Sequence, residues 1–166
     1  MSDSRPDSGA APARSNRTVD FERGIPFLIA ALGNKLSDIA SRGVRRDLGI
    51  GLMEWRIVAL LAVETEATPA RIGQVAGVDK SVVSRAAATL EQQGVVTIAA
   101  GPSGSRQTRL ILAPKGLEMH ERGIHMAFER NDALLHGFSA EERNQLAELL
   151  LRATANLPRM EAGPKP

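Results

Sequence analysis

The residues with the clearest potential for chemistry lie together just after Asp79. A helix that begins there would present four polar side chains near its N-terminal end: Lys80, Ser81, Ser84 and Arg85. Lysine and arginine donate hydrogen bonds to guanine, and serine can donate or accept at several bases. The N–H groups of a helix N-terminus also favour a phosphate. The segment therefore has the chemistry of a surface that reads DNA, although a solvated helix face is the plain alternative.

The elements around this segment decide between the two readings. Thr68 and Pro69 begin a short preceding helix, because threonine is a good N-cap and proline a good first helical residue. Gly77 supplies the tight turn between the helices, and Gly73 allows them to pack closely. Apolar side chains fill the interior positions: Ile72, Ala76, Val78, Val83 and Ala86. The pattern predicts a helix-turn-helix whose recognition helix follows Asp79 and ends near Gly94. A plain helical hairpin remains the alternative.

A β-hairpin is expected after the recognition helix. Residues 95–99 and 108–112 are rich in branched apolar side chains, and glycine, proline and serine occupy 101–105. Arg106 stands at the tip, from which a guanidinium can reach a narrow minor groove, and Arg109 follows on the returning strand. Thr68 and Gln107 complete the predicted DNA-contacting set. A merely solubilising loop is the alternative for the tip.

The rest of the chain is predicted to be helical. Apolar residues recur at helical spacing over 21–46, 52–63 and 114–135, and a capping box at Ser139 and Glu142 begins a last helix that ends at Pro158. In the helix after Pro114 the stripe consists of Leu117, Ile124, Phe128 and Leu135. The fold class is thus mainly α with a small β-hairpin wing. Residues 1–18 and 159–166 are predicted to be a disordered and a flexible tail.

Composition excludes several other classes. The 166 residues contain no cysteine, which removes disulfides, thiolate metal sites and thiol redox sensing. Aromatic residues make up 3%, too few for a surface that stacks single-stranded nucleic acid. A net charge of +2 requires any DNA site to be a local patch. No apolar run approaches a membrane span and the N-terminus lacks a signal peptide, which predicts a soluble cytoplasmic protein.

Metal binding and catalysis are not supported by the spacing of reactive residues. His120, His125 and His136 lie five and eleven residues apart, which does not stack their side chains on a helix. The segment around Ser103 is not a nucleophile elbow, and no glycine-rich phosphate loop is present. The sequence therefore predicts no metal, no cofactor and no enzyme.

Four strings in their order and spacing resemble the MarR family of bacterial winged-helix regulators. They are GLMEWRIVALL at 51–61, GVDKSVVSR at 77–85, LEQQGVV at 90–96 and LILAPKG at 110–116. The resemblance covers residues 21–158 and implies one domain over 19–158. In it, a winged core at about 50–113 is flanked by dimerisation helices at about 21–46 and 114–158.

The resemblance implies an obligate homodimer that binds a pseudo-palindromic site in double-stranded DNA. Leu149, Leu150 and Leu151 favour the same conclusion independently, because consecutive leucines make the helix apolar on more than one face. Two positions depart from the family pattern. Gly104 replaces the aspartate that pairs with the wing arginine, and Ala113 replaces a threonine that caps the next helix.

Family resemblance further implies regulation by a small organic anion. Four residues are predicted to line such a site: Arg42, Trp55, Arg56 and Phe128. An aromatic wall with a guanidinium suits a carboxylate or a thioester of one. The alternative is that Trp55 belongs to the core and the arginines are solvated. The predicted function is a transcriptional regulator, more often a repressor in this family, and a ligand-independent DNA binder is the alternative.

Overall fold

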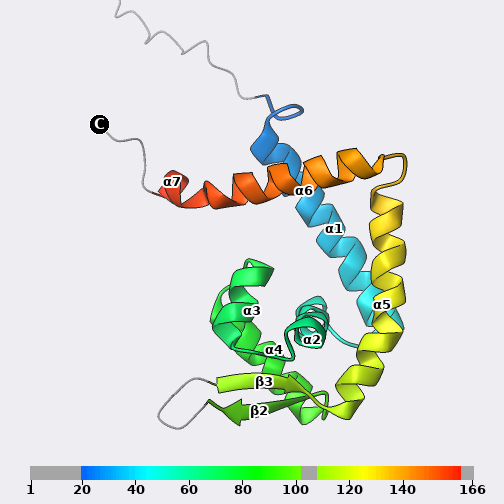
Figure 1. The fold of residues 1–166 in the computed structure, drawn as a ribbon, viewed down its shortest axis with the longest axis vertical. Helices are drawn as coiled ribbons and strands as arrows, with labels where there is room; N and C mark the ends of the chain where they lie inside the picture. The colour runs from blue at the N-terminus through cyan, green and yellow to red at the C-terminus, as the bar shows by residue number, and fades with distance from the viewer. Residues whose placement is uncertain (1–19, 102–107, 162–166) are drawn as a thin grey trace, which may run out of the picture. The chain divides into compact units, whose positions relative to one another are not determined.

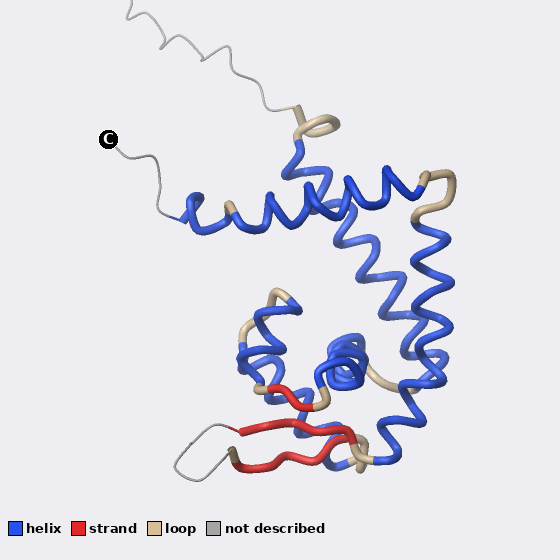
Figure 2. The backbone as a smooth tube through the Cα atoms, viewed as in Figure 1, coloured by secondary structure: helices blue, strands red, loops and turns tan. Residues whose placement is uncertain are grey.

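The computed structural model describes residues 20–101 and 108–161 (Figure 1). Helices dominate these ranges, and the strands form one small sheet (Figure 2). The elements are α1 Ile25–Leu48, α2 Leu52–Glu64, β1 Glu66–Ala67, α3 Pro69–Ala76, α4 Lys80–Gln92, β2 Val96–Ala100, β3 Thr108–Leu112, α5 Pro114–Leu134, α6 Ala140–Ala155 and α7 Leu157–Glu161. The mainly helical class and the hairpin wing are confirmed.

The chain divides into two units, Met1–Gly43 and Val44–Pro166. The packing described below lies in the second unit, which includes the last turn of α1. The predicted tail at 1–18 lies outside the described residues, as do 162–166. No helix in the described ranges is long and apolar enough to cross a membrane. The predicted domain boundaries at 19 and 158 stay predictions.

One apolar core joins α2, α3, α4 and the sheet. Its largest fully buried side chains come from each of these elements, among them Ile57, Leu61, Ile72, Leu90 and Leu110. Removing this much apolar surface from water is the main stabilising contribution to the fold. The core therefore fixes the helix-turn-helix against the sheet within the chain.

The sheet has three strands in the order β1-β3-β2, all antiparallel. The predicted hairpin is β2 and β3, in which Ile98 pairs with Leu110. Strand β1 was missed by the sequence analysis, because two residues give no periodicity and their pairing with β3 is distant in sequence. Glu66 pairs with Ile111 and Ala67 with Leu110, so β1 ties the end of α2 to the wing.

Helix α5 packs on the core through two glycines and a methionine. Gly116, Met119 and Gly123 are buried, whereas Leu117 and Phe128 are 53% and 63% exposed. A side chain at Gly123 would meet the Trp55 ring, so glycine lets the two helices approach closely. Leu117 and Phe128 of the predicted stripe therefore do not face this core.

The capping box of α6 is confirmed: the Ser139 hydroxyl accepts from the Glu142 N–H at 3.2 Å, and Glu142 accepts from the Ser139 N–H at 2.8 Å. The predicted end of this helix at Pro158 was wrong. Helix α6 ends at Ala155, and α7 begins at Leu157 with Pro158 in its first turn, where its missing N–H costs little. Residues 159–161 are thus helical, although they were assigned to the tail.

Candidate DNA-binding surface and apolar pocket

The two helices of the helix-turn-helix are set by their caps and turn. The Thr68 hydroxyl accepts from the Arg71 N–H at 3.1 Å, and the Asp79 carboxylate accepts from the Ser81 N–H at 2.7 Å. Gly77 has φ +68°, a left-handed conformation that favours glycine. A Cβ on Gly73 would lie 2.7 Å from the Val78 carbonyl oxygen, so only glycine permits this close approach. The structure places α4 as the sequence analysis predicted.

A polar groove of about 400 Å³ lies at the N-terminal ends of α3 and α4. Its lining brings together Thr68, Pro69, Ala70, Lys80, Ser84 and Thr108. Ser81 and Arg85 lie exposed on the same helix, α4. The Ser84 hydroxyl donates to the Lys80 carbonyl at 2.9 Å, which orients its lone pairs outward. Five of the eight predicted DNA-contacting residues therefore belong to this groove or to the exposed N-terminal half of α4.

The charge at this helix N-terminus is set by Asp79. Hydrogen bonds from Ser81, first through its side chain and then through its backbone N–H, hold the pKa of Asp79 below its usual value, and the charges of Lys80 and Arg85 act in the same direction. The carboxylate thus stays ionised at neutral pH and keeps the cap in place. Because Asp79 satisfies the Ser81 N–H, the exposed side chains of Lys80, Ser84 and Arg85 are available to a binding partner.

Arg109, the sixth predicted residue, lies near the start of β3, opposite Ala99 of β2, and its side chain contacts Glu66 of β1. A second hollow, of about 250 Å³, surrounds this pair and is lined by Glu64, Glu66, Ala67, Thr68, Arg71 and Arg109. Neither Glu66 nor Arg71 stands out in the sequence, and Glu66 meets an arginine 43 positions away. Arg106 and Gln107 lie outside the described residues, as does Gly104.

An apolar pocket of about 450 Å³ lies between α2 and α3. It is lined by Trp55, Arg56, Ala59, Leu60, Val63, Ile72, Val75 and Ala76. Trp55 is 7% exposed and stacks on His120 of α5, so it belongs to the core and to the pocket wall at once. Arg56 is the only cationic side chain in this lining. Phe128 does not line the pocket, and Arg42 belongs to the other unit.

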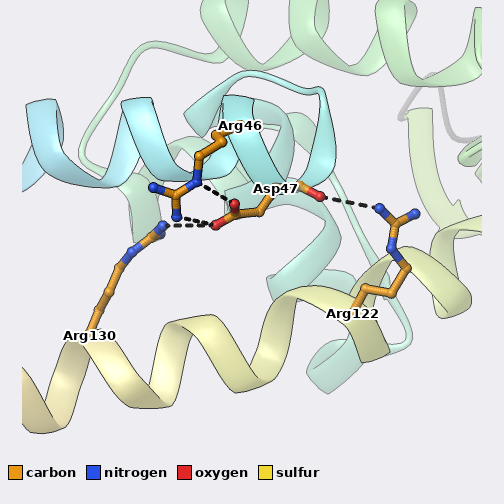
Figure 3. A network of polar contacts seen from close by, with 4 residues as sticks. All are labelled: Arg46, Asp47, Arg122 and Arg130. Carbon is orange, nitrogen blue, oxygen red and sulfur yellow. Dashed lines mark hydrogen bonds and ion pairs between the residues drawn. The ribbon is translucent and has the colours of Figure 1, made fainter.

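Three arginines gather around Asp47 at the end of α1 (Figure 3). Arg46 donates to both carboxylate oxygens at 2.6 and 2.9 Å, and Arg130 of α5 lies 3.8 Å from one of them. Arg122 donates to the Asp47 carbonyl at 3.2 Å. The hydrogen bond from Arg46 lowers the pKa of Asp47. This network ties the last turn of α1 to α5.

The described ranges hold no group of three His, Cys, Asp or Glu residues that could bind a metal ion. What the geometry offers is a helix-turn-helix with a polar groove at the start of its second helix and a sheet beside it. This is the architecture of a winged helix-turn-helix DNA-binding protein.

Comparison with known proteins agrees with this class and narrows it. Residues 48–107 match the MarR family model. A MarR/EmrR family transcriptional regulator from Acinetobacter sp. ADP1 has a similar structure, with a TM-score of 0.78 and 28% identity over 85% of this chain and 99% of that chain. The segment that carries the helix-turn-helix and the wing thus matches the MarR family, and the chain is similar in structure to transcriptional regulators of that family. These similarities are to transcriptional regulators and not to enzymes.

Two further structures share the fold. A putative MarR family regulator from Listeria monocytogenes, complexed with a 26mer DNA, has a TM-score of 0.76 and 18% identity over 87% of this chain and 98% of that chain. Bordetella bronchiseptica BpsR, whose DNA binding is regulated by 6-hydroxynicotinic acid, has a TM-score of 0.73 and 14% identity over 83% and 98%. A comparison with curated protein sequences gave no match.

Proposed function

We propose that the protein is a homodimeric repressor that binds a pseudo-palindromic operator and is released from it by a small organic anion. The observation that carries this proposal is the polar groove in which Lys80 and Ser84 of α4 meet Thr68 of α3. Side chains at the N-terminal end of a recognition helix are the ones that reach base edges in the major groove. Arg85, exposed on the same helix, is the natural partner for a guanine.

Exposed apolar side chains on α5 and α6 support the homodimer. Every residue of α6 is described and none is buried, although the helix carries Leu149, Leu150 and Leu151 at 58%, 44% and 70% exposure. Phe128 on α5 is 63% exposed. Apolar patches of this kind on a helix are typical of a subunit interface. A second copy of the chain is the occupant that a two-fold operator requires.

The apolar pocket between α2 and α3 supports the effector. Its volume of about 450 Å³ suits a small aromatic molecule, and Arg56 offers a charge-assisted hydrogen bond to a carboxylate. Occupying a pocket against α3 would bias the position of the recognition helix, which lowers DNA affinity through differential binding to the two states. Regulation of BpsR by 6-hydroxynicotinic acid, an aromatic carboxylic acid, is a precedent on the same fold.

Selection of genomic DNA fragments on the purified protein tests the core of the proposal. We expect enrichment of one pseudo-palindromic site with half-sites about one helical turn apart. Arg85→Ala should weaken binding to that site by about 1–3 kcal/mol and relax the preference at one position of each half-site. Arg159→Ala, which changes an exposed arginine on α7, is the matched control. An unchanged site preference in Arg85→Ala would remove this residue from base reading.

Sedimentation of two α6 variants tests the homodimer. Leu149→Asp places a charge on the exposed apolar face and should convert the dimer to monomer, whereas Glu148→Ala on the same helix should leave it intact. A Leu149→Asp protein that stays dimeric would contradict the assignment of this face.

Titration with aromatic carboxylic acids, beginning with 6-hydroxynicotinic acid, tests the effector pocket. Arg56→Gln should weaken binding of the best acid by at least about tenfold, because a hydrogen bond to a charged group is lost. Arg45→Gln, an exposed arginine outside the pocket lining, should not. Failure of every acid to bind or to release DNA would favour the alternative, a ligand-independent winged-helix binder.

A further inference from the structure

We propose that the Glu66 carboxylate competes with a DNA backbone phosphate for the Arg109 guanidinium and so limits the affinity of the wing for DNA. The inference rests on the proposed DNA-binding surface. Without DNA, Arg109 of β3 is paired with Glu66 of β1. On DNA, the guanidinium turns from the carboxylate to a phosphate at the edge of the polar groove.

Strand register explains why these two side chains meet. Glu66 is directly opposite Ile111 in the β1–β3 ladder, and Arg109 is two residues from Ile111 on the same strand. Side chains two residues apart share one face of a sheet, so Glu66 and Arg109 are diagonal neighbours on that face. Their side chains are 44% and 34% exposed. A phosphate arriving from solvent can therefore reach the guanidinium.

The pair borders the surface on which DNA is expected. Thr68 lines both the hollow around Glu66 and Arg109 and the groove that holds Lys80 and Ser84. Thr108, the neighbour of Arg109 in sequence, lines the same groove. A duplex whose bases meet α4 thus runs its backbone past Arg109. The Glu66 carboxylate at this place repels the DNA phosphates and occupies the guanidinium that would bind one of them.

Energetics permit the exchange. An exposed ion pair contributes little, since water screens it and both side chains lose freedom. A guanidinium bonded to phosphate makes two parallel charge-assisted hydrogen bonds and releases a counterion from the DNA. Loss of the contact to Glu66 is therefore outweighed by the contact to DNA, and the carboxylate lowers affinity by a small factor without abolishing binding.

A second ion pair in the same hollow supplies the matched control. Arg71 donates from Nη2 to Glu64 at 2.6 Å and from Nε to the same carboxylate at 3.1 Å. The hydrogen bond from Arg71 lowers the pKa of Glu64. This two-pronged pair joins α2 to α3 and holds its guanidinium more firmly. Glu64→Gln removes the same charge from the same hollow without releasing Arg109.

The test is a double-mutant cycle on a short labelled duplex of arbitrary sequence, since a phosphate contact does not depend on sequence. Glu66→Gln should tighten binding about two- to fivefold, the range expected for removal of an exposed ion pair. Arg109→Gln should weaken binding and reduce the salt slope of log K by about one. In the Arg109→Gln background, Glu66→Gln should have less than half of its original effect.

Three results would overturn the inference. An equal gain from Glu66→Gln with and without Arg109, matched by Glu64→Gln, would mean general repulsion. A loss from Glu66→Gln that equals the loss from Arg109→Gln would mean that Glu66 positions the arginine. A salt slope unchanged by Arg109→Gln would mean that no phosphate is contacted. Failure of the wild-type protein to bind any duplex is a separate outcome, which would refute the proposed function itself. Circular dichroism of each variant verifies that the fold is intact.

Discussion

Apolar side chains are buried in the region from α2 to β3, whereas many remain exposed in the region from α5 to α6. The first buries its apolar side chains in one core, with Leu90 and Leu110 fully buried. The second buries only small residues and Met119 against α2, while Leu151 and Phe128 remain 70% and 63% exposed. The first region can position DNA-reading side chains without help. The second leaves an apolar surface exposed, and this is the surface to which we assign the proposed dimer interface.

The largest expected effect comes from opening the closed core. Leu90→Ala removes a fully buried side chain of α4, and we expect the free energy of unfolding to fall by about 2–5 kcal/mol at every protein concentration. Chemical denaturation with circular dichroism measures it. Leu151→Ala is the control on α6, and its effect should appear in the concentration dependence of the unfolding midpoint. If both variants lost the same free energy of unfolding at every protein concentration, the two regions would not differ in the way proposed.

A somewhat smaller effect is expected where the two regions touch. Gly123→Ala on α5 places a methyl group against the Trp55 ring and 3.0 Å from a methyl carbon of Leu48, so the helices must separate. We expect a loss of about 1–3 kcal/mol in thermal or denaturant unfolding, together with a change in Trp55 fluorescence.

Gly33→Ala is the matched control for that variant. A Cβ at Gly33 of α1 would meet no other part of the described residues within 4 Å, so the same substitution should stabilise by about 0.5–1 kcal/mol. A Gly123→Ala protein that is as stable as the wild type would mean that α5 does not need its close approach to α2.

The helix-turn-helix and the α5 helix show which features can be predicted from the sequence and which cannot. Local signals were sufficient for the caps at Thr68 and Asp79 and for the turn at Gly77, because a cap or a turn is determined within a few residues. Hydrophobic periodicity identified Leu117 and Phe128 on α5, which are exposed, and gave no sign of the buried face of this helix, since a glycine that permits close packing contributes nothing to an apolar stripe. The role of Gly123 becomes visible only when α2, which carries Trp55, is placed against it.

The same distinction applies to the candidate site. Lys80, Ser81, Ser84 and Arg85 follow from the helix-turn-helix pattern, because their exposure depends on one short helix. Glu66 was missed, since its two-residue strand is defined only by pairing with β3. The Arg109 contact is set by that non-local register.

A helix cap at the junction between the two regions should give a modest gain. Ala113 is the N-cap of α5 with φ −79° and ψ 166°, an extended conformation suited to a capping side chain, yet no side chain caps the helix. Ala113→Thr should therefore stabilise the protein by about 0.5–1 kcal/mol in thermal unfolding. Ala113→Val has a similar shape without the hydroxyl and should not. Equal stability of the two variants would show that the α5 N-terminus gains nothing from a hydroxyl.

The smallest effect expected is the acid sensitivity of the recognition helix. Hydrogen bonds from Ser81 lower the pKa of Asp79, so its charged form stabilises the folded state. A depressed folded-state pKa contributes stability that is present above the unfolded value, about 3.9 for aspartate, and is lost as pH falls through the folded value. Asp79→Asn keeps a capping oxygen but cannot titrate at this position.

Below about pH 4 the free energy of unfolding of the wild-type protein should fall more steeply than that of Asp79→Asn, whereas at neutral pH the slopes of the two should coincide. Asp47 and Glu64 also have lowered pKa values and titrate in both proteins, so the difference between the two curves isolates the cap. Parallel curves throughout the acid range would mean that ionised Asp79 adds nothing to the start of α4, and that the groove is held by the core alone.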